Sequence, residues 1–122
     1  MPSFVPAKIE LQLTAHNDGE FYKRHIDTRT GPSDEPTVRL ISFVYYCSAS
    51  PSRFSGGALR LYGFGENDTR QVDIEPVCDS LVVFPSWAPH EVLPVACESG
   101  RFEDSRFAIN GWIRRAKAPA VT

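Results

Sequence analysis

Two side chains that commonly bind metals stand one residue apart early in the chain. His25 and Asp27 lie in Phe21–Asp27, whose residue types predict a β-strand. Residues i and i+2 of a strand point to the same face, so the imidazole and the carboxylate would project together. A third ligand must come from elsewhere, and His90 is the candidate, because His16 lies in a turn-like segment. Two histidines and one carboxylate leave three coordination positions open, as in non-haem iron(II) oxygenases.

Each part of this pattern is weak when it stands alone. A His-x-Asp pair on a strand is more often a polar surface pair, and Pro89-His90-Glu91 fits a simple turn equally well. Three cysteines and a histidine could also bind zinc, but no two of Cys47, Cys78 and Cys97 have zinc-finger spacing. Their odd number argues against a disulfide framework and favours a reducing compartment. The metal hypothesis therefore depends on the rest of the chain.

Hydrophobic alternation runs along the chain, and turn-forming residues separate the alternating segments. The pattern predicts about eight strands: Lys8–Thr14, Phe21–Asp27, Val38–Cys47, Ala58–Phe64, Arg70–Glu75, Ser80–Phe84, His90–Val95 and Ser105–Ile113. Many short strands at regular spacing indicate an all-β sandwich, barrel or jelly roll with little helix. We predict one domain over residues 1–113 and a flexible C-terminal tail over residues 114–122.

Composition and charge exclude several classes of protein. The 122 residues are 42% hydrophobic and 23% charged, which is typical of a globular protein with one core. The formal net charge of −2 offers no cationic surplus for phosphates, so we expect no nucleic-acid partner. No apolar run is long enough to span a bilayer, and the first residues do not fit a signal peptide. We therefore expect a cytoplasmic protein that does not bind membranes.

Six groups of residues, in chain order, resemble one enzyme family. Tyr22, His25 and Asp27 form a Tyr-x-x-His-x-Asp pattern, and Gly56-Gly57-Ala58-Leu59 starts a later strand. The six groups are Phe21–Asp27, Ser42–Tyr46, Phe54–Tyr62, Ile74–Pro76 with Leu81–Phe84, Pro89–Val92, and Arg106–Trp112. Their order and spacing resemble the prolyl 4-hydroxylase-like Fe(II)/2-oxoglutarate-dependent dioxygenases. The resemblance implies a double-stranded β-helix, a jelly roll of the cupin type, which agrees with the strands predicted above.

The resemblance also implies roles for side chains outside the metal pattern. Arg106 would bind the distal carboxylate of 2-oxoglutarate, because a buried guanidinium requires an anionic partner. The alternative is a surface arginine paired with Glu103 or Asp104, and Arg101 is a rival in a polar loop. The hydroxyl of Tyr46 would donate to the same carboxylate, although an ordinary core tyrosine fits as well.

Two further sites have a structural and a functional interpretation. Trp112 would wall the co-substrate pocket, and simple core packing is nearly as good an explanation. Gly56 and Gly57 would permit a tight bend at the start of a strand, with no catalytic role.

The reaction implied by the resemblance uses Fe(II), 2-oxoglutarate and O2, with ascorbate as a candidate additional reductant. It hydroxylates an unactivated C–H bond and releases succinate and CO2. The intact Asp27 favours hydroxylation over halogenation, in which a small residue replaces the carboxylate. His25, Asp27 and His90 would be the catalytic metal ligands. Because the histidines must be neutral to bind iron, we expect iron affinity to fall below about pH 6.5.

The substrate remains open between a prolyl residue in a peptide or protein and a free amino acid or other small molecule. Fold analogy favours prolyl chemistry but does not fix it. Two further alternatives are a non-catalytic jelly-roll binding module and a cupin-like enzyme without 2-oxoglutarate. The set His25, Asp27 and His90 argues against the first, and Arg106 with Tyr46 argues against the second.

Members of the resembled family carry helices that brace the larger sheet, and here the first predicted strand begins at Lys8. We therefore expect one sheet face to be bare. A homodimer or a partner chain would cover it, unless the chain is an excised domain. The loop Arg29–Thr37 follows the metal pair and could act as a lid or as a plain connection.

Overall fold

The computed structural model describes residues 4–29, 34–63 and 65–117 and consists almost entirely of β-strands. The strands are β1 (Lys8–His16), β2 (Tyr22–His25), β3 (Thr37–Tyr46), β4 (Ser55–Gly56), β5 (Leu59–Tyr62), β6 (Gln71–Ile74), β7 (Leu81–Pro85), β8 (His90–Val92), β9 (Val95–Ala96) and β10 (Arg106–Ala116). The helix found in the described residues is the short 3-10 turn η1 (Phe102–Asp104). Within those residues, no helix is long and apolar enough to cross a membrane.

Each of the eight predicted strands is present, with two additions. The predicted strand His90–Val95 is divided into β8 and β9, because Pro94 lies between them and has no N–H for a sheet hydrogen bond. Its carbonyl instead accepts a hydrogen bond of 3.1 Å from the N–H of Gly57. The short strand β4 pairs with β9 in a segment where we predicted only a loop. Phe64, the predicted end of one strand, lies outside the described residues.

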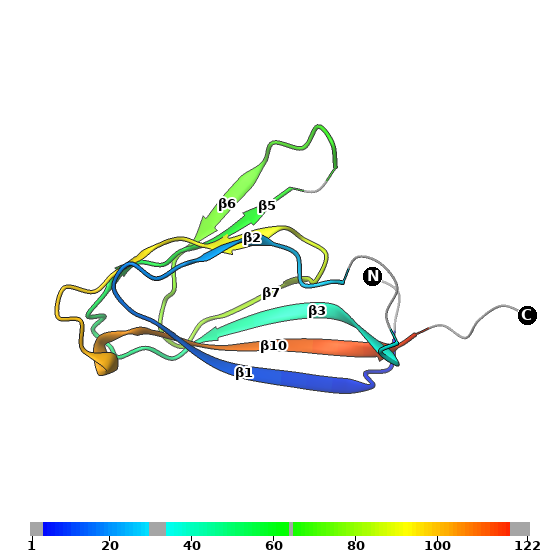
Figure 1. Ribbon diagram of the computed structural model, residues 1–122, viewed down its shortest axis with the longest axis horizontal. Helices are drawn as coiled ribbons and strands as arrows, with labels where there is room; N and C mark the ends of the chain where they lie inside the picture. The colour runs from blue at the N-terminus through cyan, green and yellow to red at the C-terminus, as the bar shows by residue number, and fades with distance from the viewer. Residues whose placement is uncertain (1–3, 30–33, 64, 118–122) are drawn as a thin grey trace, which may run out of the picture.

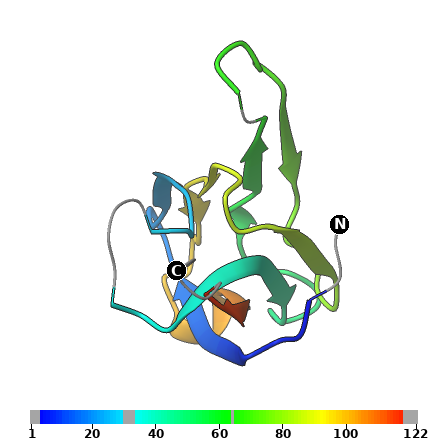
Figure 2. The same cartoon turned by 90° about the vertical axis from the view of Figure 1, so that its right-hand side faces the viewer.

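Two antiparallel sheets face each other as two layers (Figure 1). The major sheet has the order β1-β10-β3-β7, and the minor sheet has the order β2-β8-β5-β6. The hairpin β5–β6 extends away from the layers, which is clear in the view along the sheets (Figure 2). This arrangement confirms the predicted double-stranded β-helix class.

The core lies between the two sheets. Alternate residues of the major sheet point inward, among them Val44, Tyr46 and Ala108, and meet Leu59 of the minor sheet. Phe84 and Ala88 complete the cluster of buried residues. Because the side chains alternate along each strand, the inward residues of β1 and β10 include polar ones that line the site described below.

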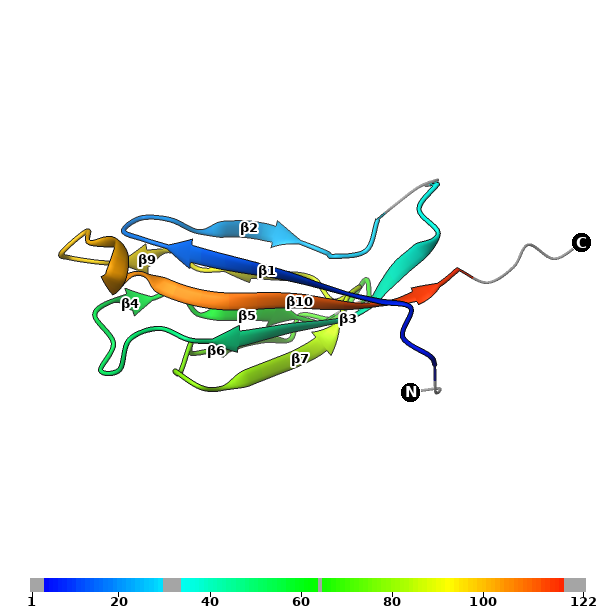
Figure 3. The ribbon, with the colours of Figure 1, turned by 90° about the horizontal axis from the view of Figure 1, so that it is seen from below.

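The outer face of the major sheet is apolar across all four strands. Ile9, Ile113, Ile41 and Pro85 form one cross-strand row; Leu11, Gly111, Phe43 and Val83 form the next; Leu13, Ile109, Tyr45 and Leu81 form the third. We call these twelve residues the outer apolar face, and its four strands lie side by side in Figure 3. Leu11 and Leu13 are 67% and 69% exposed. The expected bare face is thus present in the described part of the chain.

The C-terminal strand continues beyond the predicted domain boundary at residue 113. β10 runs to Ala116, and Arg114 forms an ion pair of 2.8 Å with Glu10 and donates to the carbonyl of Thr37. Arg114–Ala116 therefore belong to the sheet and not to the predicted flexible tail, because these contacts and the pairing with β3 hold them. Residues 118–122 of that tail and residues 30–33 of the predicted lid loop lie outside the described residues.

Candidate metal centre and adjoining pockets

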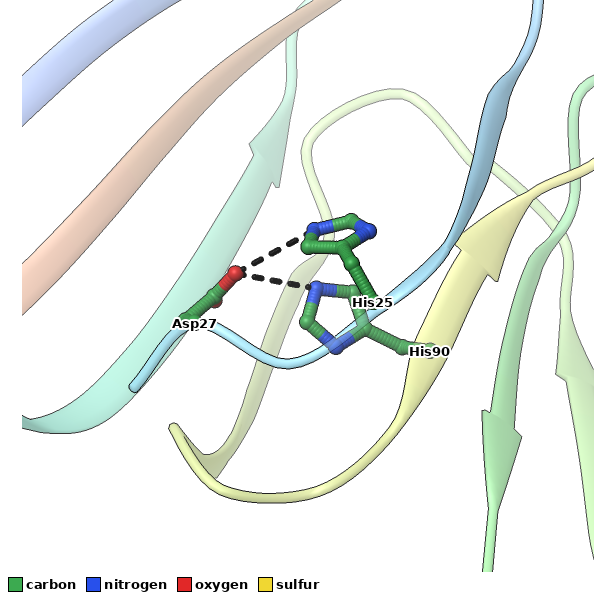
Figure 4. A group of neighbouring side chains, drawn as sticks. All are labelled: His25, Asp27 and His90. Carbon is green, nitrogen blue, oxygen red and sulfur yellow. Dashed lines mark ion pairs between the residues drawn. The ribbon is translucent and has the colours of Figure 1, made fainter. Parts of the chain in front are cut away.

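His25, Asp27 and His90 meet at one point between the sheets (Figure 4). β2 and β8 pair so that His25 lies opposite His90. Nε2 of His25 and Nε2 of His90 lie 3.2 Å and 3.3 Å from the same Oδ1 of Asp27. The three candidate ligand atoms lie within 4.8 Å of one another, so one metal ion could contact all three.

The convergence of His25 and Asp27 does not arise as the sequence analysis assumed. β2 ends at His25, and Asp27 lies in the bend that follows, so the two residues are not on one strand. The N–H of Asp27 donates to the carbonyl of Ser86 at 2.9 Å, which fixes the bend against the turn that precedes β8. The tertiary contact, and not strand alternation, therefore aims the carboxylate at the histidines.

Both histidine rings are held by their other nitrogen. Nδ1 of His25 lies 2.8 Å from the carbonyl oxygen of Lys23, and Nδ1 of His90 lies 2.8 Å from that of Ala88. A carbonyl can only accept, so each Nδ1 donates to its carbonyl, and the Nε2 of each ring is the nitrogen left to bind a metal ion. Such contacts fix the tautomer and the orientation of metal-binding histidines. Phe84 packs edge-on against His90, with ring centroids 4.7 Å apart.

The second oxygen of Asp27 is occupied by two donors. Oδ2 accepts hydrogen bonds from Oγ of Ser42 at 2.6 Å and from Nε1 of Trp112 at 2.9 Å. Ser42 also contacts Oγ of Ser86 at 2.9 Å. Oδ1 is thereby left to face the histidines. The sequence analysis missed Ser42, whose only sequence signal is its inward position on β3, opposite Trp112.

The protonation of the metal-binding side chains follows from these contacts. Burial alone would raise the pKa of Asp27, but hydrogen bonds from His25, His90 and Ser42 outweigh it and hold that pKa far below its usual range. For His25, burial lowers the pKa, but the hydrogen bond to Asp27 and the contact with Lys23 raise it above its ordinary value overall. A carboxylate that stays ionised at every physiological pH suits a divalent cation.

A pocket of about 680 Å³ begins at the metal-binding residues and extends between the sheets. Arg106 lines it and is only 2% exposed. Its Nε donates to the carbonyl of Gly57 at 2.8 Å, and no carboxylate of the described residues lies within salt-bridge distance of its guanidinium. A buried cation without an anion is costly, so this pocket is suited to an anionic ligand.

Tyr46 is completely buried beside Arg106. The guanidinium carbon of Arg106 lies 5.2 Å from the centre of the Tyr46 ring. The Tyr46 hydroxyl is buried and makes no hydrogen bond within the described part of the chain. Because buried hydroxyls are normally paired, this group is available to a bound molecule.

His16 is a third polar residue near Arg106, and the sequence analysis placed it in a turn over Ala15–Gly19. In the structure β1 extends to His16, which lies directly opposite Arg106 on β10 and lines the same pocket. Its Nδ1 is buried and has no hydrogen-bond partner among the described residues. Burial, followed by the charge of Arg106, lowers the pKa of His16, so the ring is neutral at pH 7. Continued strand alternation from Thr14 was the signal that could have revealed it.

Gly57 makes room for Arg106. Its φ of +73° is a backbone conformation that residues with a side chain rarely adopt. A Cβ at this position would lie 2.7 Å from Cδ of Arg106 and 2.9 Å from Cγ2 of Val95. We predicted that Gly56 and Gly57 permit a bend. Gly57 in addition lets its own carbonyl lie close to the guanidinium of Arg106.

A second hollow of about 820 Å³ lies on the other side of Asp27. It shares only Asp27 and Arg39 with the pocket described above. Arg39 stacks on the Trp112 ring, with its guanidinium carbon 4.0 Å from the ring centre. We call this second hollow the outer groove. Trp112, predicted to wall the co-substrate pocket, lines the first pocket and also supports Asp27.

The donor set of two imidazole nitrogens and one carboxylate oxygen fits an iron(II) ion. Hydrogen bonds hold the other nitrogen of each ring and the other oxygen of the carboxylate, as is usual for metal ligands. A double-stranded β-helix with this centre and a buried arginine in the adjoining pocket is the architecture of a 2-oxoglutarate-dependent iron oxygenase. Residues 11–114 match the model of the 2OG-Fe(II) oxygenase superfamily, and the chain belongs to this family. The resemblance seen in the sequence is thereby confirmed.

Related proteins show the same likeness. An uncharacterised PKHD-type hydroxylase from Synechocystis sp. is 45% identical over 118 residues, which is 92% of this chain and 38% of that protein. A prolyl-4-hydroxylase from Pseudomonas putida is 34% identical, with a TM-score of 0.70, over 94% of this chain and 56% of that one. A prolyl hydroxylase from Trichoplax adhaerens, solved with a peptide fragment of the hypoxia inducible factor oxygen degradation domain, is 28% identical. Its TM-score is 0.64, over 90% of this chain and 46% of that one. The chain thus spans about a third to a half of the length of these relatives.

Proposed function

We propose that this chain carries the catalytic site of an Fe(II)- and 2-oxoglutarate-dependent dioxygenase that hydroxylates an unactivated C–H bond and releases succinate and CO2. One observation carries the proposal. A His-Asp-His centre lines the same pocket as a buried arginine that has no acidic partner among the described residues. A metal site alone would fit many enzymes, and a buried cation alone would fit many anions. Together they fit a ligand that chelates the metal at one end and carries a carboxylate at the other.

His25, Asp27 and His90 would hold the iron. Iron and 2-oxoglutarate, when bound, would supply the chemistry of O2 activation, in which O2 takes two electrons from 2-oxoglutarate, giving succinate and CO2, and two from the C–H bond, with one oxygen atom entering each product. The chain's own contribution is geometric. Ser42 and Trp112 keep Oδ2 of Asp27 occupied, so that Oδ1 stays directed at the metal. The apolar residues Val44, Leu59 and Phe84 line the pocket and reduce the access of water.

Arg106 would bind the distal carboxylate of 2-oxoglutarate, with Tyr46 and His16 as additional donors. The fit is chemical: within the described residues the guanidinium has no anionic partner, and His16 Nδ1 and the Tyr46 hydroxyl are buried without a hydrogen-bond partner. A dianionic ligand would satisfy all three at once. Because His16 is neutral, it would donate a hydrogen bond to the carboxylate and would add no second positive charge beside Arg106.

A prolyl residue of a peptide or protein is the substrate that we propose. Support comes from two of the similar solved structures, both of them prolyl hydroxylases, one in complex with a peptide. The outer groove adjoins the metal centre and is separate from the co-substrate pocket, so both ligands could be bound together. Ascorbate is a proposed additional reductant.

We also propose a protein partner for the outer apolar face and a cytoplasmic location. Twelve apolar or glycine side-chain positions in one plane form a patch of the kind that marks protein interfaces. A second copy of the chain or a partner chain would cover it. Three free cysteines, two of them exposed, suit a reducing compartment.

The direct test is anaerobic addition of Fe(II) and 2-oxoglutarate, followed by admission of air. We expect a metal-to-ligand charge-transfer absorbance before air and succinate after it, since members of this class turn over slowly without substrate. His25→Ala should lose the absorbance and Arg106→Ala should require much more 2-oxoglutarate to develop it. Arg101→Ala, a change to an exposed arginine paired with Glu103, is the matched control and should behave as wild type. Folded protein with neither absorbance nor succinate would contradict the proposal and favour a non-catalytic binding module.

A further inference from the structure

The outer groove is lined by residues near the start of β1 and the end of β10. Figure 3 shows that β1 begins and β10 ends at the same end of the sheet. The residues of the groove come from the start of β1, the bend after β2, the start of β3 and the end of β10. Asp27, one of the metal-binding residues, forms part of its wall. A molecule bound in this groove would therefore lie beside Asp27, outside the pocket of Arg106.

The charge of the groove differs from that of the whole chain. The groove is lined by six cationic side chains, Lys8, Arg29, Arg39, Arg114, Arg115 and Lys117, and by three carboxylates, Glu10, Asp27 and Glu35. The chain as a whole has a formal charge of −2. Positive charge is thus concentrated in this groove on an otherwise acidic protein, and such a concentration attracts anions and speeds their association.

The three carboxylates of the groove are engaged within the protein, and Glu35 lies 3.9 Å from Arg114. Glu10 is shared by Arg39 at 3.0 Å and Arg114 at 2.8 Å, and the hydrogen bond from Arg39 holds its pKa below the usual value against the opposing effect of burial. Asp27 points its carboxylate at the two histidines. Lys8 at the start of β1 and Arg115 at the end of β10, which are neighbouring strands, add further positive charge to the wall of the groove.

We infer that the outer groove binds the peptide substrate and selects an acidic one, with carboxylate side chains on either side of the residue that is hydroxylated. This inference rests on the proposed function and names its substrate class. Cations spread along a groove match several carboxylates on an extended chain better than the one or two charges of a small molecule. Arg39, at the edge of the groove, stacks on the ring of Trp112, and Trp112 donates a hydrogen bond to the carboxylate of Asp27. A single side chain thus links the groove to this carboxylate.

The test compares three fluorescent peptides of equal length with one central proline, flanked by Asp and Glu, by Ser and Gly, or by Lys. Binding is measured by anisotropy to the full chain loaded anaerobically with Fe(II) and 2-oxoglutarate. We expect the acidic peptide to bind about tenfold more tightly than the neutral one at low salt, and the difference to shrink at 0.5 M NaCl because salt screens exposed charges. The lysine peptide should bind most weakly.

Two variants locate the effect. The double change Lys8→Glu and Arg115→Glu should remove the preference for the acidic peptide and leave binding of the neutral peptide within about twofold. Neither residue pairs with Glu10, so the ion-pair cluster of Arg39 and Arg114 is retained. The control is Arg101→Glu, which reverses one charge just before η1, at the opposite end of the sheets (Figure 1). It should leave the preference for the acidic peptide intact.

The outcomes separate this inference from the proposed function. Equal binding of acidic and neutral peptides, with charge-transfer absorbance and succinate formation intact, would overturn the acidic substrate and leave the oxygenase standing. Loss of the absorbance in wild-type protein would instead remove the oxygenase, whatever the peptides do. Tighter binding of a single-stranded oligonucleotide of equal charge than of the acidic peptide would overturn the inference in favour of a nucleic-acid substrate.

Discussion

The indole Nε1 of Trp112 donates a hydrogen bond of 2.9 Å to Oδ2 of Asp27, a residue 85 positions earlier in the chain. The same ring is covered on one face by the guanidinium of Arg39. One side chain therefore orients a metal-binding carboxylate and supports a cation of the outer groove. Trp112 would act on a bound metal through Asp27, and we therefore propose it as a positioning residue.

Replacement of this donor should weaken the metal site without emptying it. Trp112→Phe keeps an aromatic ring but removes the N–H, and we expect iron affinity to fall about tenfold, the lower end of the range for outer contacts of metal ligands. Anaerobic Fe(II) titration measures the change. Phe102→Leu, at a 71% exposed aromatic residue of η1, is the control and should have wild-type affinity. Unchanged affinity in Trp112→Phe would show that Ser42 alone orients Asp27.

Iron affinity should depend on pH through the histidines. The pKa of His25 is raised above its ordinary value, and a protonated imidazole cannot bind a metal. Affinity should therefore be highest above this raised pKa and should fall as the pH decreases through it, by up to about tenfold per pH unit for each histidine that titrates. Titrations between pH 5 and 8 measure this, and His16→Gln should leave the profile unchanged. A constant affinity over that range would contradict the ligand assignment.

The neutral ring of His16 should contribute to co-substrate binding and not to the metal. His16→Leu removes the buried hydrogen-bonding nitrogen, and we expect 2-oxoglutarate to bind roughly fivefold more weakly, since one hydrogen bond contributes about 1 kcal/mol. Calorimetric titration of 2-oxoglutarate into the metal-loaded protein without O2 measures this effect. Iron affinity should remain that of the wild type. Equal 2-oxoglutarate affinity in both proteins would show that His16 is only a wall of the pocket.

Gly57→Ala should damage the co-substrate end of the pocket. The new Cβ would meet Cδ of Arg106 at 2.7 Å and would require a residue with a side chain to adopt a φ of +73°. We expect a loss of about 1–3 kcal/mol in unfolding free energy and weaker 2-oxoglutarate binding. Gly100→Ala is a matched control, because Gly100 has a φ of +67° but has open space where the Cβ would lie. If both variants lose stability equally and both bind 2-oxoglutarate normally, the contact with Arg106 has no effect of its own.

The outer apolar face should drive association. Leu11 and Leu13 on β1 and Leu81 and Val83 on β7 are exposed at the two edges of the same sheet face, and apolar surface of this extent favours burial. Light scattering at rising protein concentration should show a dimer or larger species, and Leu11→Lys should shift it toward monomer. A strictly monomeric wild type at high concentration would contradict self-association and leave a different partner chain as the proposal.

Much of this protein could be predicted from its sequence. Alternation with period two predicted the strands, because successive side chains of a strand face opposite sides of the sheet. Pro94 divided one predicted strand, and the pairing of Arg114 with Glu10 extended another. His25, Asp27 and His90 could be proposed as ligands because few residue types bind iron and because the pattern around them is specific, and the structure brings their ligand atoms within 4.8 Å of one another.

Tertiary structure alone decided how these residues act. Asp27 faces the histidines through a backbone contact with Ser86 and hydrogen bonds with Ser42 and Trp112, all of them distant in sequence. His16 joins Arg106 only because β1 pairs with β10 in that register, and a register cannot be read from either strand alone. The outer groove likewise forms because the start of β1 pairs with the end of β10. This pairing brings cationic side chains that are far apart in the sequence together beside Asp27.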